Sequence, residues 1–333
     1  MPRMPTLADV NAARHRLRGV ALHTPLEPSR ALAEESGASE VRLKREEVQP
    51  TGAFKLRGAS NKVALIAEGR PEAALVTASS GNHGIAVASA AARHDMRLTV
   101  LVGRSVSPAK LERLRALETG RITVELTGSD TDDAEAEGRR RDDAGHAIYI
   151  SPYNDPDVVA GQATVGVEIL DDWPEVDTIV VPVGGGGLIG GIGLWAKAVR
   201  PNVKLIGVQP AASPPLYAYF ETGSTEPMPI APTVADGVAG NIERDSLTWK
   251  LCRQVVDEMV LVEEEEIADA LRWALEVPHL LLEGSAVLGI AALRGGRIDA
   301  AGRNVAVVTT GRNVTLDTLR AVLRPKDAPQ PPA

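Results

Sequence analysis

The sequence predicts an α/β protein with two open, twisted, mainly parallel sheets flanked by helices. Short runs of β-branched residues alternate with alanine- and leucine-rich stretches, which is the pattern of βαβ units. The predicted strands are almost continuously apolar, as is typical of parallel strands covered by helices on both faces. A chain of 333 residues with 44% hydrophobic and 24% charged residues has the composition of a compact globular protein with a large core.

The predicted strands fall into two series along the chain. In the first series, strands are expected at residues 73–79, 97–102, 121–126 and 146–150, separated by helices at 84–94, 108–118 and 132–145. In the second series, strands are expected at 176–183, 203–209, 258–262 and 304–310, with a helix at 269–282. We therefore expect a small domain at residues 73–150 and a large domain formed by residues 1–72 and 151–325. The proline-rich tail at 326–333 is expected to be disordered, because it lacks apolar periodicity.

Composition argues against several classes of protein. The formal net charge is −8 and the basic residues are scattered, so binding to nucleic acid or to an anionic membrane is not expected. The single cysteine, Cys252, cannot form an internal disulfide or a multi-cysteine metal cluster. The opening MPRMPTLADV lacks the layout of a signal peptide, which favours a cytoplasmic protein. The apolar window 178–196 contains seven glycines and a proline, which favour a strand, a turn and a helix over a membrane span.

A run of four glycines gives the strongest signal for binding a phosphate. In VDTIVVPVGGGGLIGGIGLWAKAVR, a strand is expected to end at Val183, Gly184–Gly187 follow, and a helix begins near Leu188. Unhindered backbone N–H groups and a helix N-terminus then converge on one point, where they bind an anion. The structural alternative is a closely packed turn between strand and helix, which needs fewer glycines.

The same run contains the spacing G-x-G-x-x-G at Gly185, Gly187 and Gly190, so a dinucleotide site is an alternative. That site needs an acidic residue at the end of the next strand, but the strand at 203–209 ends in Gln209. A lysine followed by serine or threonine, as in nucleoside triphosphate sites, is also missing after the glycines. A smaller phosphate ester therefore fits better.

A second turn between strand and helix, TASSGNHGIAVASAA, is rich in hydrogen-bonding groups. Hydroxyl, amide and backbone N–H donors at a helix N-terminus suit a small carboxylate. The alternative is an ordinary serine cap, which explains one serine but not the whole run. The run consists of Ser79, Ser80, Gly81, Asn82, His83 and Gly84.

Lys55 lies between Phe54 and Leu56 in the apolar stretch TGAFKLRGAS. An amine in apolar surroundings has a lowered pKa and keeps a neutral, nucleophilic fraction, which imine formation with an aldehyde requires. The alternative is a surface lysine whose stem lies on apolar neighbours. Together with a phosphate site, the lysine indicates pyridoxal 5′-phosphate, the phosphate cofactor that works through a lysine imine.

The stretches FKLRGA, SSGNHG and VGGGGL together resemble the fold-type II pyridoxal-phosphate enzymes, which share a tryptophan synthase β-like fold. The resemblance extends over roughly residues 7–324 and is strongest to the branch of threonine/serine dehydratases (ammonia-lyases) and serine racemases. It implies that Lys55 and Phe54 contact the cofactor, Asn82 binds its 3′-oxygen, and Thr310 lies near its pyridine nitrogen. It also implies a phosphate site at Gly184, Gly185, Gly186, Gly187 and Leu188. The substrate carboxylate would be bound by Ser79, Ser80, Gly81, Asn82 and His83.

The implied reaction is β-elimination from a β-hydroxy amino acid, L-threonine or L-serine first, to a 2-oxo acid and ammonia. Lys55 would take the α-proton, and Ser80 matches the second acid/base of the racemase branch, so racemisation is an alternative. Arg312 in TTGRN replaces a glycine of the commoner SGGN. Its guanidinium suits a second substrate carboxylate or an acidic neighbour, and the variation resembles hydroxyectoine-pathway and 3-hydroxyaspartate dehydratases. A nicotinamide-dependent oxidoreductase and a silent amino-acid-binding protein are alternatives from other classes.

Several residues depart from the pattern of the resembled family. Cation-dependent members carry acidic residues where this chain has Gln209, Ser213 and Pro215, so no divalent cation is expected. The chain ends soon after LDTLRAVL, which argues against a regulatory domain and inhibition by isoleucine. Tyr153 is expected to flank the site, and Glu283 is expected to cap a helix or to lie near the cofactor. A homodimer is implied by the resemblance.

Overall fold

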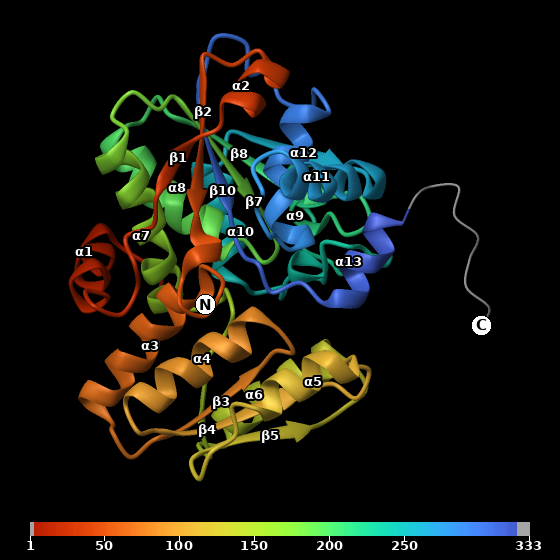
Figure 1. Ribbon diagram of the computed structural model, residues 1–333. Helices are drawn as coiled ribbons and strands as arrows, with labels where there is room; N and C mark the ends of the chain where they lie inside the picture. Colours follow the sequence, from red (N-terminus) through yellow and green to blue (C-terminus); the bar gives the residue numbers. More distant parts are fainter. Residues whose placement is uncertain (1–2, 325–333) are drawn as a thin grey trace.

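The computed structural model describes residues 3–324 and contains two mainly parallel sheets flanked by helices, which confirms the predicted fold class (Figure 1). The predicted disordered tail at 326–333 lies outside the described residues. All neighbouring strands of the larger sheet are parallel except the first pair, which is antiparallel. In spatial order, this sheet contains β1 (Leu26–Pro28), β2 (Glu40–Arg45), β10 (Asn304–Thr309), β7 (Thr178–Pro182), β8 (Lys204–Pro210) and β9 (Glu258–Val262).

Helices cover both faces of the large sheet because its strands are apolar on both sides. Alternate residues of β7 show this: Val180 packs into one core cluster, and Ile179 and Val181 pack into another. The first cluster includes residues of α2 (Arg30–Ser36), α11 (Glu264–Glu276), η3 (Gly284–Val287), α12 (Leu288–Arg294) and α13 (Leu316–Leu323). The second includes residues of α7 (Pro156–Asp172), α8 (Gly187–Val199), α9 (Pro215–Thr222) and α10 (Leu247–Val255).

The smaller sheet is wholly parallel and lies below the large one in Figure 1. In spatial order, it contains β5 (Ile122–Leu126), β4 (Arg97–Val102), β3 (Ala74–Ala78) and β6 (Ile148–Tyr149). One core cluster joins it to α3 (Lys55–Gly69), α4 (Asn82–Arg93) and α5 (Pro108–Arg115). A second cluster, on the other face, joins it to α6 (Thr131–Asp143).

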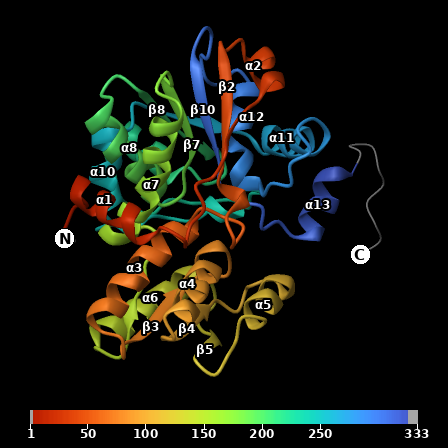
Figure 2. The same cartoon turned by 60° about the vertical axis from the view of Figure 1, so that its left-hand side comes forward.

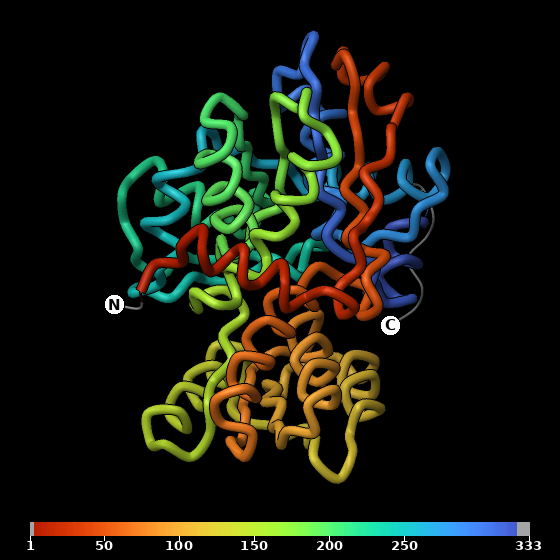
Figure 3. Tube along the Cα trace, turned by 90° about the vertical axis from the view of Figure 1, so that its left-hand side faces the viewer, coloured from red at the N-terminus to blue at the C-terminus, as the bar shows by residue number. Residues whose placement is uncertain are grey.

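Three further short elements complete the described chain. The N-terminal helix α1 (Leu7–Arg16) packs against α7 and α3, and Figure 3 shows it running alongside the junction between the two sheets. The 3₁₀ turn η1 (Glu46–Val48) follows β2, and the 3₁₀ turn η2 (Asp236–Val238) precedes α10. Helix α3 contacts both α4 and α7, so it joins the parts built on the two sheets (Figure 2). The domain boundaries at residues 73 and 150 stay a prediction.

The helix expected at 269–282 differs from the one observed. Helix α11 begins earlier, at Glu264, and ends at Glu276. Pro278 follows two residues later and His279 has a φ of +56°, so the helix cannot continue into the leucines at 280–282. The strand at 146–150 is also shorter than expected, because only Ile148 and Tyr149 pair with β3.

The apolar window at 178–196 contains strand β7, the glycine turn and the first ten residues of α8. Across residues 3–324, no helix has the length and hydropathy needed to cross a bilayer.

Candidate active site

A cavity of about 610 Å³ lies between the two sheets, and all the cofactor- and substrate-binding residues implied by the resemblance line it. The wall that belongs to the large sheet includes the glycine turn, Thr310 and Tyr153. The wall that belongs to the small sheet includes the turn at the start of α4. The predicted residues are Phe54, Lys55, Ser79, Ser80, Gly81, Asn82, His83, Gly184, Gly185, Gly186, Gly187, Leu188 and Thr310.

Lys55 is the first residue of α3 and is partly buried in the cavity wall. Its Nζ donates a hydrogen bond to the carbonyl oxygen of Pro152 at 2.8 Å and lies 5.2 Å from the centre of the Phe54 ring. Burial lowers the pKa of Lys55 from 10.5 to about 8, and the negative charges of Glu135 and Glu283 oppose this shift. About a tenth of the amine is therefore neutral at pH 7, which is the neutral fraction that the sequence predicted for an imine-forming lysine.

Buried contacts fix the start of α3. The backbone N–H of Phe54 donates to the carbonyl oxygen of Thr310 at 3.0 Å. Two residues after Lys55, the guanidinium of Arg57 is 1% exposed and pairs with the carboxylates of Glu46 at 2.7 Å and Glu168 at 2.6 Å. Planar bidentate pairs of this kind constrain orientation as well as charge. The Lys55 amine is therefore held by a rigid helix end.

The glycine turn is closely packed and contains one residue with positive φ. Gly186 precedes α8 with a φ of +82°, a conformation that favours glycine. A Cβ at Gly185 would lie 2.3 Å from Cγ of Tyr153, and one at Gly186 would lie 2.9 Å from Sγ of Cys252. The first-turn N–H groups of a helix have no acceptor within the helix. Because Gly184 to Leu188 line the cavity, these donors fit a phosphate group there.

Asn82 opens α4 and reaches the opposite wall. Its Nδ2 donates to Oε1 of Glu283 at 2.8 Å, and its Oδ1 accepts from Nδ2 of Asn313 at 2.5 Å. The backbone N–H of Asn313 donates to Oε2 of Glu283 at 3.2 Å. Burial raises the pKa of Glu283 to about 7. Glu283 thus lies in the cavity wall, as one of the two sequence hypotheses proposed.

The remaining residues of the SSGNHG turn also face the cavity. The N-cap of α4 is Gly81, without a side-chain cap bond, so an ordinary serine cap does not account for the turn. His83 is buried, and its Nε2 lies 3.0 Å from the carbonyl oxygen of Ile150. Burial lowers its pKa to about 3, so the ring is neutral. Since the carbonyl oxygen of Ile150 only accepts, Nε2 carries the proton of the neutral ring, and the buried Nδ1 is an acceptor without a partner among the described residues.

The side chain of Arg312 is exposed and does not line the cavity. A Cβ at the neighbouring Gly311 would lie 2.5 Å from Oε1 of Glu283, so this position is closely packed. The nearby residues Thr310 and Asn313 do line the cavity, so recognition of a second substrate carboxylate by Arg312 stays a prediction. The charged lining residues that the sequence did not single out are Lys110, Arg113, Asp130, Asp132, Glu135 and Asp236.

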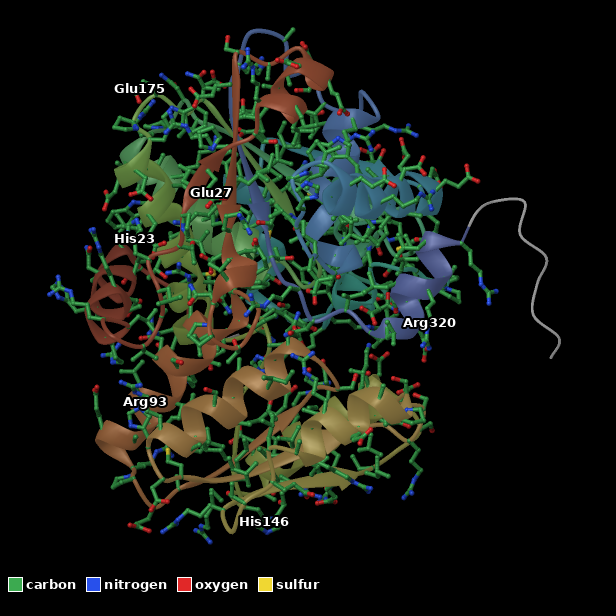
Figure 4. The ribbon with its side chains drawn as sticks, viewed as in Figure 1. His23, Glu27, Arg93, His146, Glu175 and Arg320 are labelled. Atoms are coloured by element: carbon green, nitrogen blue, oxygen red, sulfur yellow. The ribbon has the colours of Figure 1, made fainter. Side chains whose placement is uncertain are left out.

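No cluster of His, Cys, Asp and Glu residues suited to holding a metal ion occurs within residues 3–324. His23 and His146 lie far apart on the surface (Figure 4). Gln209 is buried, and its Oε1 accepts a hydrogen bond from the backbone N–H of Tyr217 at 2.8 Å.

The two-sheet fold, the lysine of lowered pKa and the glycine turn at a helix N-terminus define the class of a fold-type II pyridoxal-phosphate enzyme. The chain belongs to the family described as "Pyridoxal-phosphate dependent enzyme", whose model matches residues 18–311. The family, the fold and the cofactor predicted from the sequence are thereby confirmed.

The similar proteins include enzymes of several activities. L-threonine ammonia-lyase of Thermotoga maritima is 39% identical over 96% of this chain and 78% of its own length. L-threo-3-hydroxyaspartate ammonia-lyase of Pseudomonas sp. is 34% identical over 95% of this chain and 98% of its own. The structure of maize serine racemase superposes with a TM-score of 0.88 at 29% identity, covering 96% of this chain and 97% of the other.

Proposed function

We propose that the protein removes water and then ammonia from a β-hydroxy amino acid, L-threonine or L-serine first, and forms a 2-oxo acid. The observation that carries this proposal is the position of the Lys55 amine in one cavity with the glycine turn and the SSGNHG turn. The identity to ammonia-lyases over most of the chain supports the same reaction. When bound, pyridoxal phosphate acts as an electron sink for negative charge at the substrate α-carbon.

The cavity residues have two separate roles toward the substrate, proton transfer and carboxylate binding. Lys55 has a pKa of about 8, so the amine can accept the α-proton and return it near neutral pH. The N-terminus of α4, with Ser79, Ser80 and Gly81, binds the substrate carboxylate through hydroxyl and backbone donors. The β-hydroxyl takes up a proton, which balances the one that Lys55 removes from the α-carbon, and leaves as water. The released enamine becomes an imine, whose hydrolysis gives the 2-oxo acid and ammonia.

The other cavity residues hold the cofactor. Gly184 to Leu188 would bind its phosphate, Asn82 would bind its 3′-oxygen, and Phe54 would contact it. Thr310 meets the pyridine nitrogen with a neutral hydroxyl, which favours rapid loss of a β-substituent over reversible chemistry such as transamination. We further propose a cytoplasmic homodimer that needs no divalent cation.

A panel of β-hydroxy amino acids assayed for 2-oxo acid and ammonia tests the reaction. Wild-type holoenzyme is expected to release both products in equal amounts from at least one member, and Lys55→Ala to release neither. The panel includes L-threonine, L-serine and 3-hydroxyaspartate, because the relatives named above include both kinds of ammonia-lyase. Oxidation of the substrate coupled to reduction of a nicotinamide, without release of ammonia, would instead support the oxidoreductase alternative.

Racemisation is the second candidate, since Ser80 lines the same cavity as Lys55 and the structure of a serine racemase superposes well. Two groups on opposite faces of the α-carbon can remove a proton from one side and add it to the other. Incubation of holoenzyme with L-serine and chiral chromatography tests this candidate. Formation of D-serine by the wild type but not by Ser80→Ala supports racemisation. If the wild type forms no D-serine, racemisation is excluded.

A further inference from the structure

Helix α6 gives the cavity an acidic wall that the proposed reaction does not use. Asp130, Asp132 and Glu135 come from its N-terminal end and line the cavity. The two aspartates lie at the exposed rim, whereas the side chain of Glu135 is 13% exposed. In Figure 2, α6 belongs to the part of the molecule built on the small sheet.

Glu135 lies close enough to the reacting amine to affect its charge. Its carboxylate is the strongest of the charges that raise the pKa of Lys55, ahead of Glu283. The charge of Glu135 also raises the pKa of the hydroxyl group of Tyr153, which lines the same cavity. Because Lys55 and Glu135 line one cavity, an amino acid held with its α-carbon at Lys55 shares that cavity with the Glu135 carboxylate.

The cations around Glu135 do not balance its charge. Its Oε2 accepts from Arg139 at 3.3 Å, but Arg139 also pairs with Oε1 of Glu243 at 3.0 Å. One guanidinium therefore serves two carboxylates, and the group carries an excess negative charge. Burial raises the pKa of Glu135 to about 7, and the charge of Glu243 adds to this shift. A cation placed beside Glu135 would balance the excess negative charge and lower the pKa of Glu135.

The two other cations of the cavity wall, both on α5, are engaged with groups of the large-sheet wall. Lys110 pairs with Asp236 at 2.5 Å, and Arg113 donates to Oδ1 of Asn313 at 2.5 Å. A substrate side chain beside α6 therefore meets carboxylates rather than free cations.

We propose that Glu135 selects the substrate side chain by pairing with a cationic group on it, so that the enzyme prefers a β-hydroxy amino acid with a terminal amine. This inference rests on the proposed function, because it places the amino acid with its α-carbon at Lys55. A substrate with a terminal carboxylate is disfavoured, since like charges would face each other across the cavity. L-threonine, whose side chain is neutral, is expected to be preferred less than the cationic substrate and more than the anionic one.

Three four-carbon amino acids without a β-hydroxyl test the pairing apart from turnover. L-2,4-diaminobutyrate, L-2-aminobutyrate and L-aspartate carry a cationic, a neutral and an anionic end, and none can lose water. Their affinities for the holoenzyme are measured by calorimetry. The diamine is expected to bind at least about tenfold more tightly than aspartate, which is the size of one charged hydrogen bond. Equal affinities, or tighter binding of aspartate, would overturn the inference.

Variants of the helix give the matched comparison. Glu135→Gln should abolish the preference for the diamine, and Glu135→Lys should reverse it in favour of aspartate. The control is Glu137→Gln, on the same helix, whose carboxylate pairs with Arg140 and Arg141 and does not line the cavity. This control should retain the wild-type order. Thermal melting identifies an unfolded variant, and the other Glu135 variant then decides the question.

The outcome also separates this inference from the proposed function. A wild-type order of affinities that the Glu135 variants leave unchanged contradicts the inference alone, whatever the enzyme turns over. A holoenzyme that prefers the diamine but releases no 2-oxo acid from any β-hydroxy amino acid contradicts the proposed reaction alone. A fall in turnover of every substrate in Glu135→Gln, with unchanged order of affinities, would assign Glu135 to proton transfer and overturn the selection role.

Discussion

Asn82 and Glu283, which are 201 residues apart in the sequence, are joined by a hydrogen bond of 2.8 Å from Nδ2 to Oε1. The bond links the first residue of α4, beside the small sheet, to the residue before η3, beside the large one. Asn313 donates to Glu283 through its backbone N–H and to Asn82 through its side-chain amide, which completes a triangle of hydrogen bonds. The triangle keeps the carboxyl group of Glu283 buried in the cavity wall, so its pKa in the folded protein differs from that in the unfolded chain.

Glu283→Gln should remove part of the pH dependence of stability. The pKa of Glu283 is raised from 4.5 to about 7 in the folded protein, so between these values the folded state binds more protons than the unfolded state. Its contribution is fully present below about pH 4.5 and is lost as the pH rises through about 7. From about pH 5 to pH 8, the free energy of unfolding of the variant should therefore rise relative to that of the wild type by up to about 3 kcal/mol.

Urea unfolding of both proteins, freed of cofactor, at the two pH values measures this change. A difference in the free energy of unfolding that stays constant with pH would mean that Glu283 titrates in the folded protein as it does in water.

Cofactor uptake should report the lowered pKa of Lys55. The neutral amine attacks the aldehyde, and its fraction rises roughly tenfold per pH unit below the pKa. The rate of covalent reconstitution should therefore rise with pH and level off above about 8. Stopped-flow absorbance on protein freed of cofactor follows the reaction. A rate that keeps rising toward pH 10.5, the ordinary value for lysine, would contradict a buried amine.

Gly186→Ala should weaken cofactor binding as well as stability. An L-residue with positive φ costs about 1–2 kcal/mol, and the new Cβ would also crowd Cys252 and Thr248 beneath the turn. Gly223→Ala is the control, because Gly223 has a φ of +73° but open space around it and does not line the cavity. Equilibrium dialysis with the cofactor and urea unfolding compare the two. Equal loss of stability with unchanged cofactor affinity in both would show that the turn has no special role.

The parts of the site carried by local sequence could be predicted before the structure. The glycine turn and the SSGNHG turn each combine donors within one short segment, and Lys55 differs from its apolar neighbours. These signals need no knowledge of which strands pair. The order of the βαβ units is likewise local, because each strand is followed by a helix of its own.

The residues that act across the cavity could not be predicted in the same way. Asn313 and Glu135 belong to segments with ordinary polar patterns, and each acquires its role only when two sheets face each other. Arg312 shows the opposite limit, since it is next in sequence to the site while its side chain is exposed, and its role stays a prediction. Strands β1 and β2 also escaped prediction, because β1 has only three residues and the sequence of β2, EVRLKR, is mostly charged.

Removal of divalent cations should leave activity unchanged. The carbonyl oxygen of the Gln209 side chain already accepts a hydrogen bond from Tyr217, and its amide nitrogen is not a ligand for a hard cation. Dialysis of the holoenzyme against a chelator, followed by an assay for 2-oxo acid, checks this. Loss of activity that magnesium restores would show that a cation site exists despite Gln209.

The central claim is that the amine of Lys55 binds pyridoxal phosphate covalently. Borohydride reduction of the holoenzyme, followed by intact-mass and peptide mass spectrometry, tests it most directly. The expected result is one phosphopyridoxyl group per chain, located on Lys55 and absent in Lys55→Ala. An unmodified chain, or a modification on another lysine, would contradict the claim and the reaction built on it.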